Sequence, residues 1–276
     1  MKSADDSRAT DQRTSNSVID NALAVLRCFS TEEPLLGVTE IAHRVGIHKS
    51  TASRLLSTLE SSDLVERDPM SRQFRLGMGL ISVAAPLLAN MDVRRVAYPV
   101  LQDLTSQSGE TTALVLWNGY ESVCVEQVAS SHQIKHTSPL GARYNTAYSS
   151  SVQIFLAEQS TERVKSLLRS GAVSMAEPTD QRLDDYCEQL TQVRTAGVAM
   201  NYGKASVDEV GISAGIRDHR GDLIAAIMVA APRFRVSEYQ ASIIADAAVS
   251  AANEVSQRLG YSSSSQNSVA VHASDH

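Results

Sequence analysis

Lysine, arginine and hydroxyl side chains are concentrated in one short stretch of this 276-residue chain. Between positions 41 and 59 the chain carries Arg44, Lys49 and Arg54 and no acidic residue, although its net charge is −6. Side chains that can donate hydrogen bonds to phosphates or base edges follow one another here: Lys49, Ser50, Thr51, Ser53 and Arg54. Because a focused positive patch attracts the phosphate backbone, the stretch predicts a DNA-binding surface.

Two short helices must hold these side chains. Ile41, Ala42 and Val45 form one apolar stripe, which indicates a first helix. Gly46 follows, where a sharp turn suits a residue free to take a positive φ. Apolar residues then recur at the spacing of one helix face: Ala52, Leu55, Leu56 and Leu59. The pattern is typical of a helix-turn-helix, although helix pairs in enzymes can show the same spacing.

A hairpin follows the second helix, from Leu64 to Leu76, around the turn formers of residues 68–71. A two-stranded wing in this place would convert the helix-turn-helix into a winged helix. Arg67, Arg72 and Arg75 decorate it and could reach phosphates. The alternative is that they are ordinary solvated charges of a hairpin.

Two helical segments flank this domain. A helix is expected over residues 18–29, capped by Ser17, after a polar arm of residues 1–16 that we expect to be disordered. The apolar run of residues 80–89 predicts a linker helix that packs against a partner or another domain, and Pro86 should kink or end it. We place the winged domain at residues 17–77 and the linker at residues 78–92.

The rest of the chain predicts an α+β domain over residues 93–260. A helix over residues 93–107 opens it. Asn118-Gly119 predicts a hairpin of residues 111–117 and 120–128, and a second hairpin joins residues 209–217 to 223–231. Between and after the hairpins lie helical patterns, at residues 151–157, 161–169, 180–196 (stopped by Gly197) and 237–259. An antiparallel sheet with helices on its faces is a common ligand-binding architecture. The serine-rich tail, residues 261–276, is expected to be disordered.

Several other classes of protein are disfavoured by the sequence. There is no apolar run long enough for a membrane span and no signal peptide, so we expect a cytoplasmic protein without membrane partners. Cys28, Cys124 and Cys187 are far apart and suit buried small side chains. His132 and His136 are four residues apart but lack an HExxH motif, and no P-loop or GxGxxG occurs, so we expect neither metal nor cofactor.

The residues resemble the IclR family of bacterial transcriptional regulators from about residue 17 to residue 260. In the first domain the matching segments are Ala22-Leu23-Ala24-Val25-Leu26, Thr39-Glu40-Ile41-Ala42, Lys49-Ser50-Thr51, Arg54-Leu55-Leu56-Ser57-Thr58-Leu59 and Phe74-Arg75-Leu76-Gly77. In the second they are Gly141-Ala142-Arg143, Ala196-Gly197-Val198-Ala199 and residues 227–232. The resemblance implies a winged helix, a linker helix and a GAF-like effector domain. It also implies dimers or tetramers on partly palindromic operator DNA.

The chain departs from the family in its effector domain. A His-Ala-Thr/Ser-x-x-Gly-Lys-Ala stretch is replaced by residues 147–154, AYSSSVQI. Polar positions that bind small carboxylates in relatives fall here, by spacing, on Asn201, Gly211, Met228 and Ala230. Three of these four have no polar side chain, so a glyoxylate-sized anion would lose hydrogen bonds.

We therefore expect a larger and flatter effector, such as an aromatic acid or its derivative. Tyr144, Tyr148 or Tyr202 would lie beside its ring, and Ser149, Ser150 and Ser151 would bind its polar group. The tyrosines could equally be ordinary core residues. The function predicted is a ligand-responsive regulator, a repressor of catabolic genes and not an enzyme. The alternative is a hydrolase fused to a DNA-binding domain, although residues 149–151 lack a nucleophile elbow.

Overall fold

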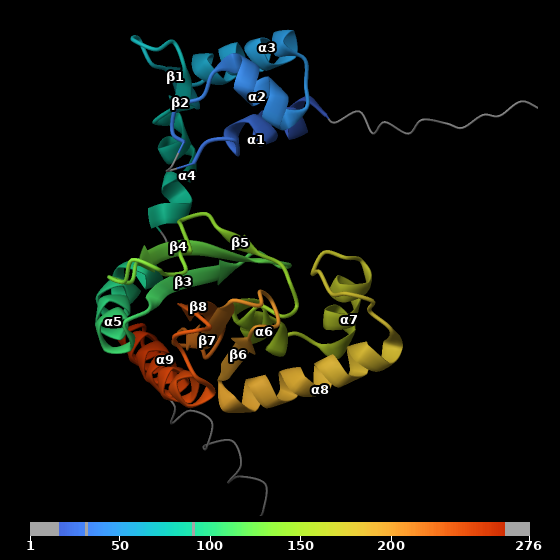
Figure 1. The fold of residues 1–276 in the computed structure, drawn as a ribbon, viewed down its shortest axis with the longest axis vertical. Coiled ribbons are helices and arrows are strands. Elements are labelled where there is room, and N and C mark those ends of the chain that lie inside the picture. Colours follow the sequence, from blue (N-terminus) through green and yellow to red (C-terminus); the bar gives the residue numbers. More distant parts are fainter. Residues whose placement is uncertain (1–16, 31–32, 90–91, 263–276) are drawn as a thin grey trace, which may run out of the picture. The chain divides into compact units, whose positions relative to one another are not determined.

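The computed structural model describes residues 17–30, 33–89 and 92–262. The chain divides into two compact units, Met1–Asn90 and Met91–His276 (Figure 1). The predicted arm of residues 1–16 and the tail beyond residue 262 lie outside the described residues. No helix within those described ranges is long and apolar enough to cross a membrane.

The first unit is a winged helix. Helices α1 (Val18–Leu26), α2 (Val38–Val45) and α3 (Lys49–Ser61) precede a hairpin of β1 (Val65–Arg67) and β2 (Phe74–Leu76). Their inward side chains form one small core: Val25, Phe29, Leu36, Ile41, Leu55, Leu56, Leu59, Val65 and Phe74. This confirms the predicted helix-turn-helix and wing.

Local signals fix the ends of these helices. Ser17 caps α1 in a reciprocal capping box with Asp20, as expected. Gly46 ends α2 at φ 73°, the left-handed conformation that glycine tolerates best. Helix α1 stops at Leu26, short of the expected position 29, and Phe29 turns back into the core.

Leu36 adds an unpredicted bridge to the wing. Its amide donates to the Phe74 carbonyl at 2.9 Å, and the Phe74 amide donates to the Leu36 carbonyl at 2.8 Å. The segment before α2 is thereby joined to β2. The wing is thus held by three chain segments, although the sequence predicts only two.

Helix α4 (Gly79–Ala89) follows the wing. Pro86 does not end this helix, which continues to Ala89, and the alternative expectation that Pro86 kinks it stays a prediction. A proline removes the backbone hydrogen bond that its nitrogen would donate and crowds the preceding turn, and this helix continues despite that cost.

The second unit is a six-stranded antiparallel sheet in the order β5-β4-β3-β8-β7-β6. In chain order its elements are α5 (Asp92–Ser108), β3 (Thr111–Trp117), β4 (Ser122–Val128), β5 (Arg143–Tyr144), α6 (Ser150–Ala157), α7 (Thr161–Arg169), α8 (Asp180–Ala196), β6 (Val198–Tyr202), β7 (Glu209–Arg217), β8 (Leu223–Pro232) and α9 (Glu238–Arg258).

Helices cover both faces of this sheet (Figure 1). Helices α5 and α9 pack on one face, in a core that includes Leu101, Leu114, Ile216 and Val255. Helices α6, α7 and α8 enclose a second core on the other face, which includes Val115, Val152 and Met228. The α+β prediction is therefore confirmed, and the unit has two hydrophobic cores separated by the sheet.

The structure corrects some details of the strands. Strand β4 starts at Ser122, not at residue 120, because the turn holds four residues: the Asn118 side-chain oxygen accepts from the amides of Tyr120 (3.3 Å) and Glu121 (3.1 Å). Strands β5 and β6, at the two edges of the sheet, were not predicted. They exist through pairing with β4 and β7.

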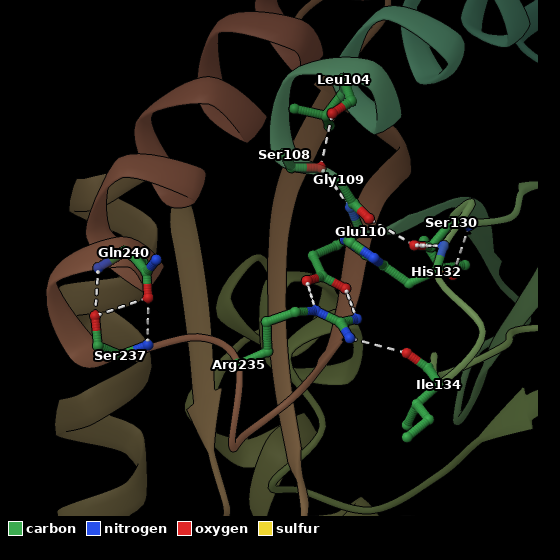
Figure 2. A network of polar contacts seen from close by, with 11 residues as sticks. Leu104, Ser108, Gly109, Glu110, Ser130, His132, Ile134, Arg235, Ser237 and Gln240 are labelled. Atoms are coloured by element: carbon green, nitrogen blue, oxygen red, sulfur yellow. Dashed lines mark hydrogen bonds and ion pairs between the residues drawn. The ribbon is translucent and has the colours of Figure 1, made fainter.

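Loops meet at the end of the sheet where β3 and β7 begin and β8 ends. Figure 2 shows the buried Glu110 carboxylate paired with Arg235, whose Nη1 also donates to the Ile134 carbonyl at 2.9 Å. His136 Nε2 lies 3.3 Å from the Asp208 carbonyl oxygen. Across the described ranges, no group of three or more His, Cys, Asp or Glu side chains could hold a metal ion.

Candidate functional site

The outer face of α3 carries the residues predicted to contact DNA. Lys49, Ser50, Thr51, Ser53 and Arg54 are all exposed, and the opposite face of the helix is buried in the core. His48 precedes the helix without a side-chain capping bond. The first turn of α3 therefore presents its backbone N–H groups and the positive end of the helix dipole next to Lys49.

Two of the three basic charges on this stretch remain unpaired. Arg44 is held by Glu33 at 2.9 Å and by Glu40 at 2.5 Å, so its charge is largely compensated. Within the described part of the chain, Lys49 and Arg54 form no ion pair and stay available to a polyanion.

The three wing arginines differ in how strongly they are held. Arg67 lies over the Phe74 ring, 4.5 Å from its centroid, and 3.6 Å from Glu60. Arg75 pairs with Glu66 at 2.5 Å. Arg72 is exposed at the tip, at φ 59°, and forms no ion pair with any described residue. Of the three, Arg72 is the one whose charge is free.

The four positions that spacing predicts for an effector site lie on one face of the second sheet. Asn201, Gly211 and Ala230 lie side by side in one row across β6, β7 and β8. Met228, two residues before Ala230, pairs with Ser213 in a parallel row. These side chains share the α6 face, because alternate strand residues point the same way and Ser213 bonds to α6.

The predicted serines stand at the start of α6 and bond to the sheet. Ser150 Oγ lies 2.9 Å from Ser213 Oγ. Ser151 Oγ lies 2.7 Å from Ser122 Oγ and 3.0 Å from Ser149 Oγ, which makes a chain of three hydroxyls. All five hydroxyls belong to buried residues. Ser149 is the N-cap but makes no capping bond, so the first N–H groups of α6 are not capped by its side chain.

The three tyrosines have different environments. The Tyr144 hydroxyl donates to Ser138 Oγ at 2.7 Å, and burial raises the pKa of Tyr144. Tyr148 is half-buried immediately before the serines. Tyr202 instead packs on the α5/α9 side: its hydroxyl donates to the Val236 carbonyl at 3.0 Å. Tyr144 therefore packs on the α6 side of the sheet, Tyr148 directly precedes the serines of α6, and Tyr202 lies on the opposite side.

Asn201 shapes the neighbouring loop. Its buried side-chain oxygen accepts from the amides of Lys204 (2.8 Å) and Ala205 (3.0 Å). These bonds fix the turn that joins β6 to β7. A ligand would find this oxygen already engaged.

Three further polar residues on the α6 side of the sheet were not predicted from the sequence: Ser122, Glu209 and Ser213. Two of them could have been predicted, because Glu209 and Ser213 alternate with Gly211 along β7 and must share its face. The register that brings Ser122 to Ser151 could not be read in this way.

Comparison with known families decides the class of protein. The family model described as the bacterial transcriptional regulator IclR C-terminal domain matches residues 85–257, and that of the IclR helix-turn-helix domain matches residues 18–69. This chain belongs to the IclR family. Both units of the structure are thus accounted for by one family of DNA-binding transcriptional regulators.

Individual relatives agree with the family. The HTH-type transcriptional repressor AllR of Escherichia coli K12 is 26% identical over 243 residues, which are 88% of this chain and 90% of AllR. A crystal structure of an IclR-family transcriptional regulator is 47% identical and has a TM-score of 0.61, covering 62% of this chain and 98% of that one.

A further solved structure is an IclR homologue of Microbacterium hydrocarbonoxydans, complexed with 4-hydroxybenzoate. It has a TM-score of 0.69 and is 23% identical, covering 87% of this chain and 99% of its own. The curated IclR-family relatives are repressors, so the protein is a regulator and not an enzyme.

Proposed function

We propose that the protein is an effector-controlled repressor that binds operator DNA in the cytoplasm as a homodimer or homotetramer. The observation that carries this proposal is the exposed α3 face, where Lys49 and Arg54 form no ion pair with a described residue, in a domain that matches the IclR helix-turn-helix. The target genes are proposed to be catabolic, in keeping with an effector that is a small metabolite.

The proposed DNA contacts divide into two kinds. The exposed α3 side chains would lie in or beside the major groove, where Arg54 can bind guanine with two hydrogen bonds. The wing arginines would contact phosphates, which position the protein without reading sequence. Among them, Arg72 needs to break no existing ion pair with a described residue.

Exposed apolar side chains support self-association. On α1, Val18 and Ile19 are 73% and 71% exposed, and on α4, Ile81 and Val83 are 53% and 74% exposed. Apolar surface of this kind marks a site for a partner. A second copy would place two α3 helices about one turn of DNA apart, or a multiple of it, on a palindromic operator.

The proposed effector lies against the α6 face of the second sheet and is an aromatic acid or its derivative. Gly211, Ala230 and Met228 carry no polar side chain, and Tyr144 packs against the core on the same side of the sheet. The start of α6 can accept a carboxylate, because the first N–H groups of a helix bind anions. The 4-hydroxybenzoate complex of the Microbacterium homologue is consistent with this class of ligand. Binding would shift the population between states that fit the operator and states that do not.

Fluorescence anisotropy with a labelled duplex tests the DNA assignment. The duplex is first selected from random sequences with the full-length protein. Affinity should fall steeply with salt, and Arg54→Ala should weaken binding by about 1–3 kcal/mol. Arg220→Ala, which removes an exposed arginine of the second unit, is the matched control and should bind normally. A flat salt response would contradict the assignment.

Calorimetry tests the effector class. The full-length protein is titrated with glyoxylate, benzoate and hydroxybenzoates. An aromatic acid should bind more tightly than glyoxylate. Tight glyoxylate binding without any aromatic binding would refute the proposed class, and would leave the DNA assignment standing.

A further inference from the structure

One acidic side chain on the α6 side of the second sheet has no hydrogen-bond or ion-pair partner among the described residues. Glu209, the first residue of β7, shares its face with Gly211 and Ser213. A Cβ atom on Gly211 would lie 3.5 Å from Glu209 Oε1 and 3.1 Å from Ser150 Oγ. The α-carbon of Gly211 is therefore closely flanked by a carboxylate oxygen and a hydroxyl, and a side chain at this position would be tight against Ser150.

The backbone of Glu209 is firmly held. Its amide donates to the Ser206 carbonyl at 3.2 Å, its carbonyl accepts from the Gly203 amide at 2.9 Å, and it pairs with Pro232. The carboxylate, by contrast, makes no hydrogen bond or ion pair with any described residue, although the residue is only partly exposed. A half-buried carboxylate without donors is stabilised by any ligand that supplies one.

The nearby cations and hydroxyls are engaged elsewhere. Arg233 lies over the Tyr202 ring, 4.9 Å from its centroid, on the other side of the sheet, and Lys135 donates to the Ser130 carbonyl at 2.7 Å. The Tyr144 hydroxyl donates to Ser138, and both burial and the charge of Glu209 raise the pKa of Tyr144. Ser150 is bonded to Ser213. None of these groups neutralises Glu209.

We propose that Glu209 is a specificity-determining residue of the effector site, where it accepts a hydrogen bond from a hydroxyl or nitrogen of the effector. The effector is then an acid that also carries a hydrogen-bond donor within reach of the Glu209 carboxylate. The same carboxylate repels another carboxylate, so the acid group of the effector must lie farther from Glu209 than its hydrogen-bond donor does. This inference rests on the effector site proposed above.

Matched ligands test the donor requirement. Full-length protein is titrated calorimetrically with the three monohydroxybenzoates, with benzoate and with the three methoxybenzoates. The methoxybenzoates resemble the hydroxybenzoates in size but have no hydroxyl to donate a hydrogen bond. At least one hydroxybenzoate should bind about 10-fold or more tightly than benzoate and its own methoxy analogue, as expected for a bond to a charged acceptor. Lactate and propionate form an aliphatic pair that makes the same comparison without a ring.

Variants assign the preference to Glu209. In Glu209→Leu the donor-bearing and donor-free ligands should bind within about 3-fold of each other, and Glu209→Gln should show an intermediate preference, because its amide oxygen still accepts a weaker hydrogen bond. Asp208→Asn changes the neighbouring exposed carboxylate and should keep the wild-type preference. Circular dichroism and Trp117 fluorescence confirm that each variant is folded.

The outcomes separate this inference from the effector class. If hydroxybenzoate and benzoate bind equally to the wild type, or if Glu209→Leu keeps the preference, the inference about Glu209 is overturned while an aromatic effector stands. If only the lactate–propionate pair shows a preference that Glu209→Leu abolishes, the inference stands and the aromatic class fails. Binding by no acid at all overturns both.

Discussion

Arg235 forms two parallel hydrogen bonds with Glu110, although 125 residues separate them: Nε donates to Oε1 at 2.6 Å and Nη2 to Oε2 at 2.7 Å (Figure 2). The third donor, Nη1, reaches the Ile134 carbonyl. One guanidinium thus ties together the start of β3, the loop after β4 and the segment before α9. That loop also contacts the β6–β7 loop beside the effector face, through His136 and Asp208.

Glu110→Gln should destabilise the second unit by about 2 kcal/mol. Breaking a fully buried ion pair costs about 3–5 kcal/mol, and the cost is lower here because water reaches the Arg235 side chain, which is 24% exposed. Urea unfolding followed by Trp117 fluorescence measures the effect. Trp117 is the single tryptophan of the chain and lies in β3, so its signal reports on the second unit.

Glu254→Gln is the matched control. Glu254 and Arg258 form an exposed i,i+4 pair on α9, with side chains about half exposed. Its removal should change the free energy of unfolding by less than about 0.5 kcal/mol. Equal effects for the two variants would show that the Glu110 pair is no stronger than a surface pair.

Much of this fold could be predicted because its signals are local. Helices α7 and α8 begin and end where the sequence indicates, since Ser160 and Thr179 cap their first turns and Gly197 stops α8 at φ 69°. The apolar face of α3 and the turn at Gly46 follow from spacing in the same way. A cap or stripe needs only neighbours in the sequence.

The remaining features depend on partners far away in the chain. Arg44 counts as a free charge in the sequence, but Glu33, eleven residues earlier, binds it. Tyr202 was expected beside a ligand together with Asn201, yet the two are successive residues of β6 and so point to opposite faces of the sheet. That this segment is a strand depends on its pairing with β7, and the pairing of Arg44 depends on Glu33, so both positions are decided by partners that the local sequence does not show.

Gly77→Ala should unfold or strongly destabilise the winged helix. A Cβ at position 77 would lie 2.2 Å from the Asp63 carbonyl oxygen, which is backbone and cannot move aside easily. Forced overpacking of this kind costs about 1–3 kcal/mol or more. Far-UV circular dichroism in urea should show early loss of helix, while the Trp117 transition stays unchanged.

Gly37→Ala tests whether a steric clash causes the destabilisation expected for Gly77→Ala. Gly37 belongs to the same unit at φ −83°, and a Cβ there would meet nothing within 4 Å. The free energy of unfolding of Gly37→Ala should differ from that of the wild type by less than about 1 kcal/mol, the usual scale of an N-cap change. If both variants behave alike, the clash with Asp63 is not what requires glycine at position 77.

Arg72→Gly should separate DNA binding from stability. Arg72 is exposed at φ 59°, a conformation that glycine adopts with less strain. Glycine also raises the conformational entropy of the unfolded chain, which opposes this gain, so the free energy of unfolding should change by no more than about 1 kcal/mol. Operator affinity should fall and the salt slope should drop by about one, as for a lost phosphate contact. Unchanged affinity would remove Arg72 from the interface.

Arg67→Ala should behave differently from Arg72→Gly. Its guanidinium lies over Phe74, so the variant should also lose about 0.5–1 kcal/mol of stability in the first unit. Chemical unfolding followed by circular dichroism measures this. A stability equal to that of the wild type would mean that the stacked arginine adds nothing to the wing.

Cys124 should make the second unit less stable in alkali. The thiol is buried and donates to the Ser138 carbonyl at 2.9 Å, and burial raises the pKa of Cys124 from 9.0 to about 11. The folded state therefore keeps a proton that the unfolded state loses. Its stabilising contribution is complete below pH 9 and is lost as the pH rises toward 11, with a slope of up to about 1.4 kcal/mol per pH unit.

The pH dependence of Trp117-detected unfolding measures this contribution. Between about pH 8 and pH 10 the wild type should lose about 1 kcal/mol more than Cys124→Ser, whose hydroxyl can still donate to Ser138 and does not titrate in that range. Cys28→Ser lies in the first unit and should keep the wild-type loss. Parallel pH profiles for the wild type and Cys124→Ser would show that the Cys124 thiol does not govern alkaline stability.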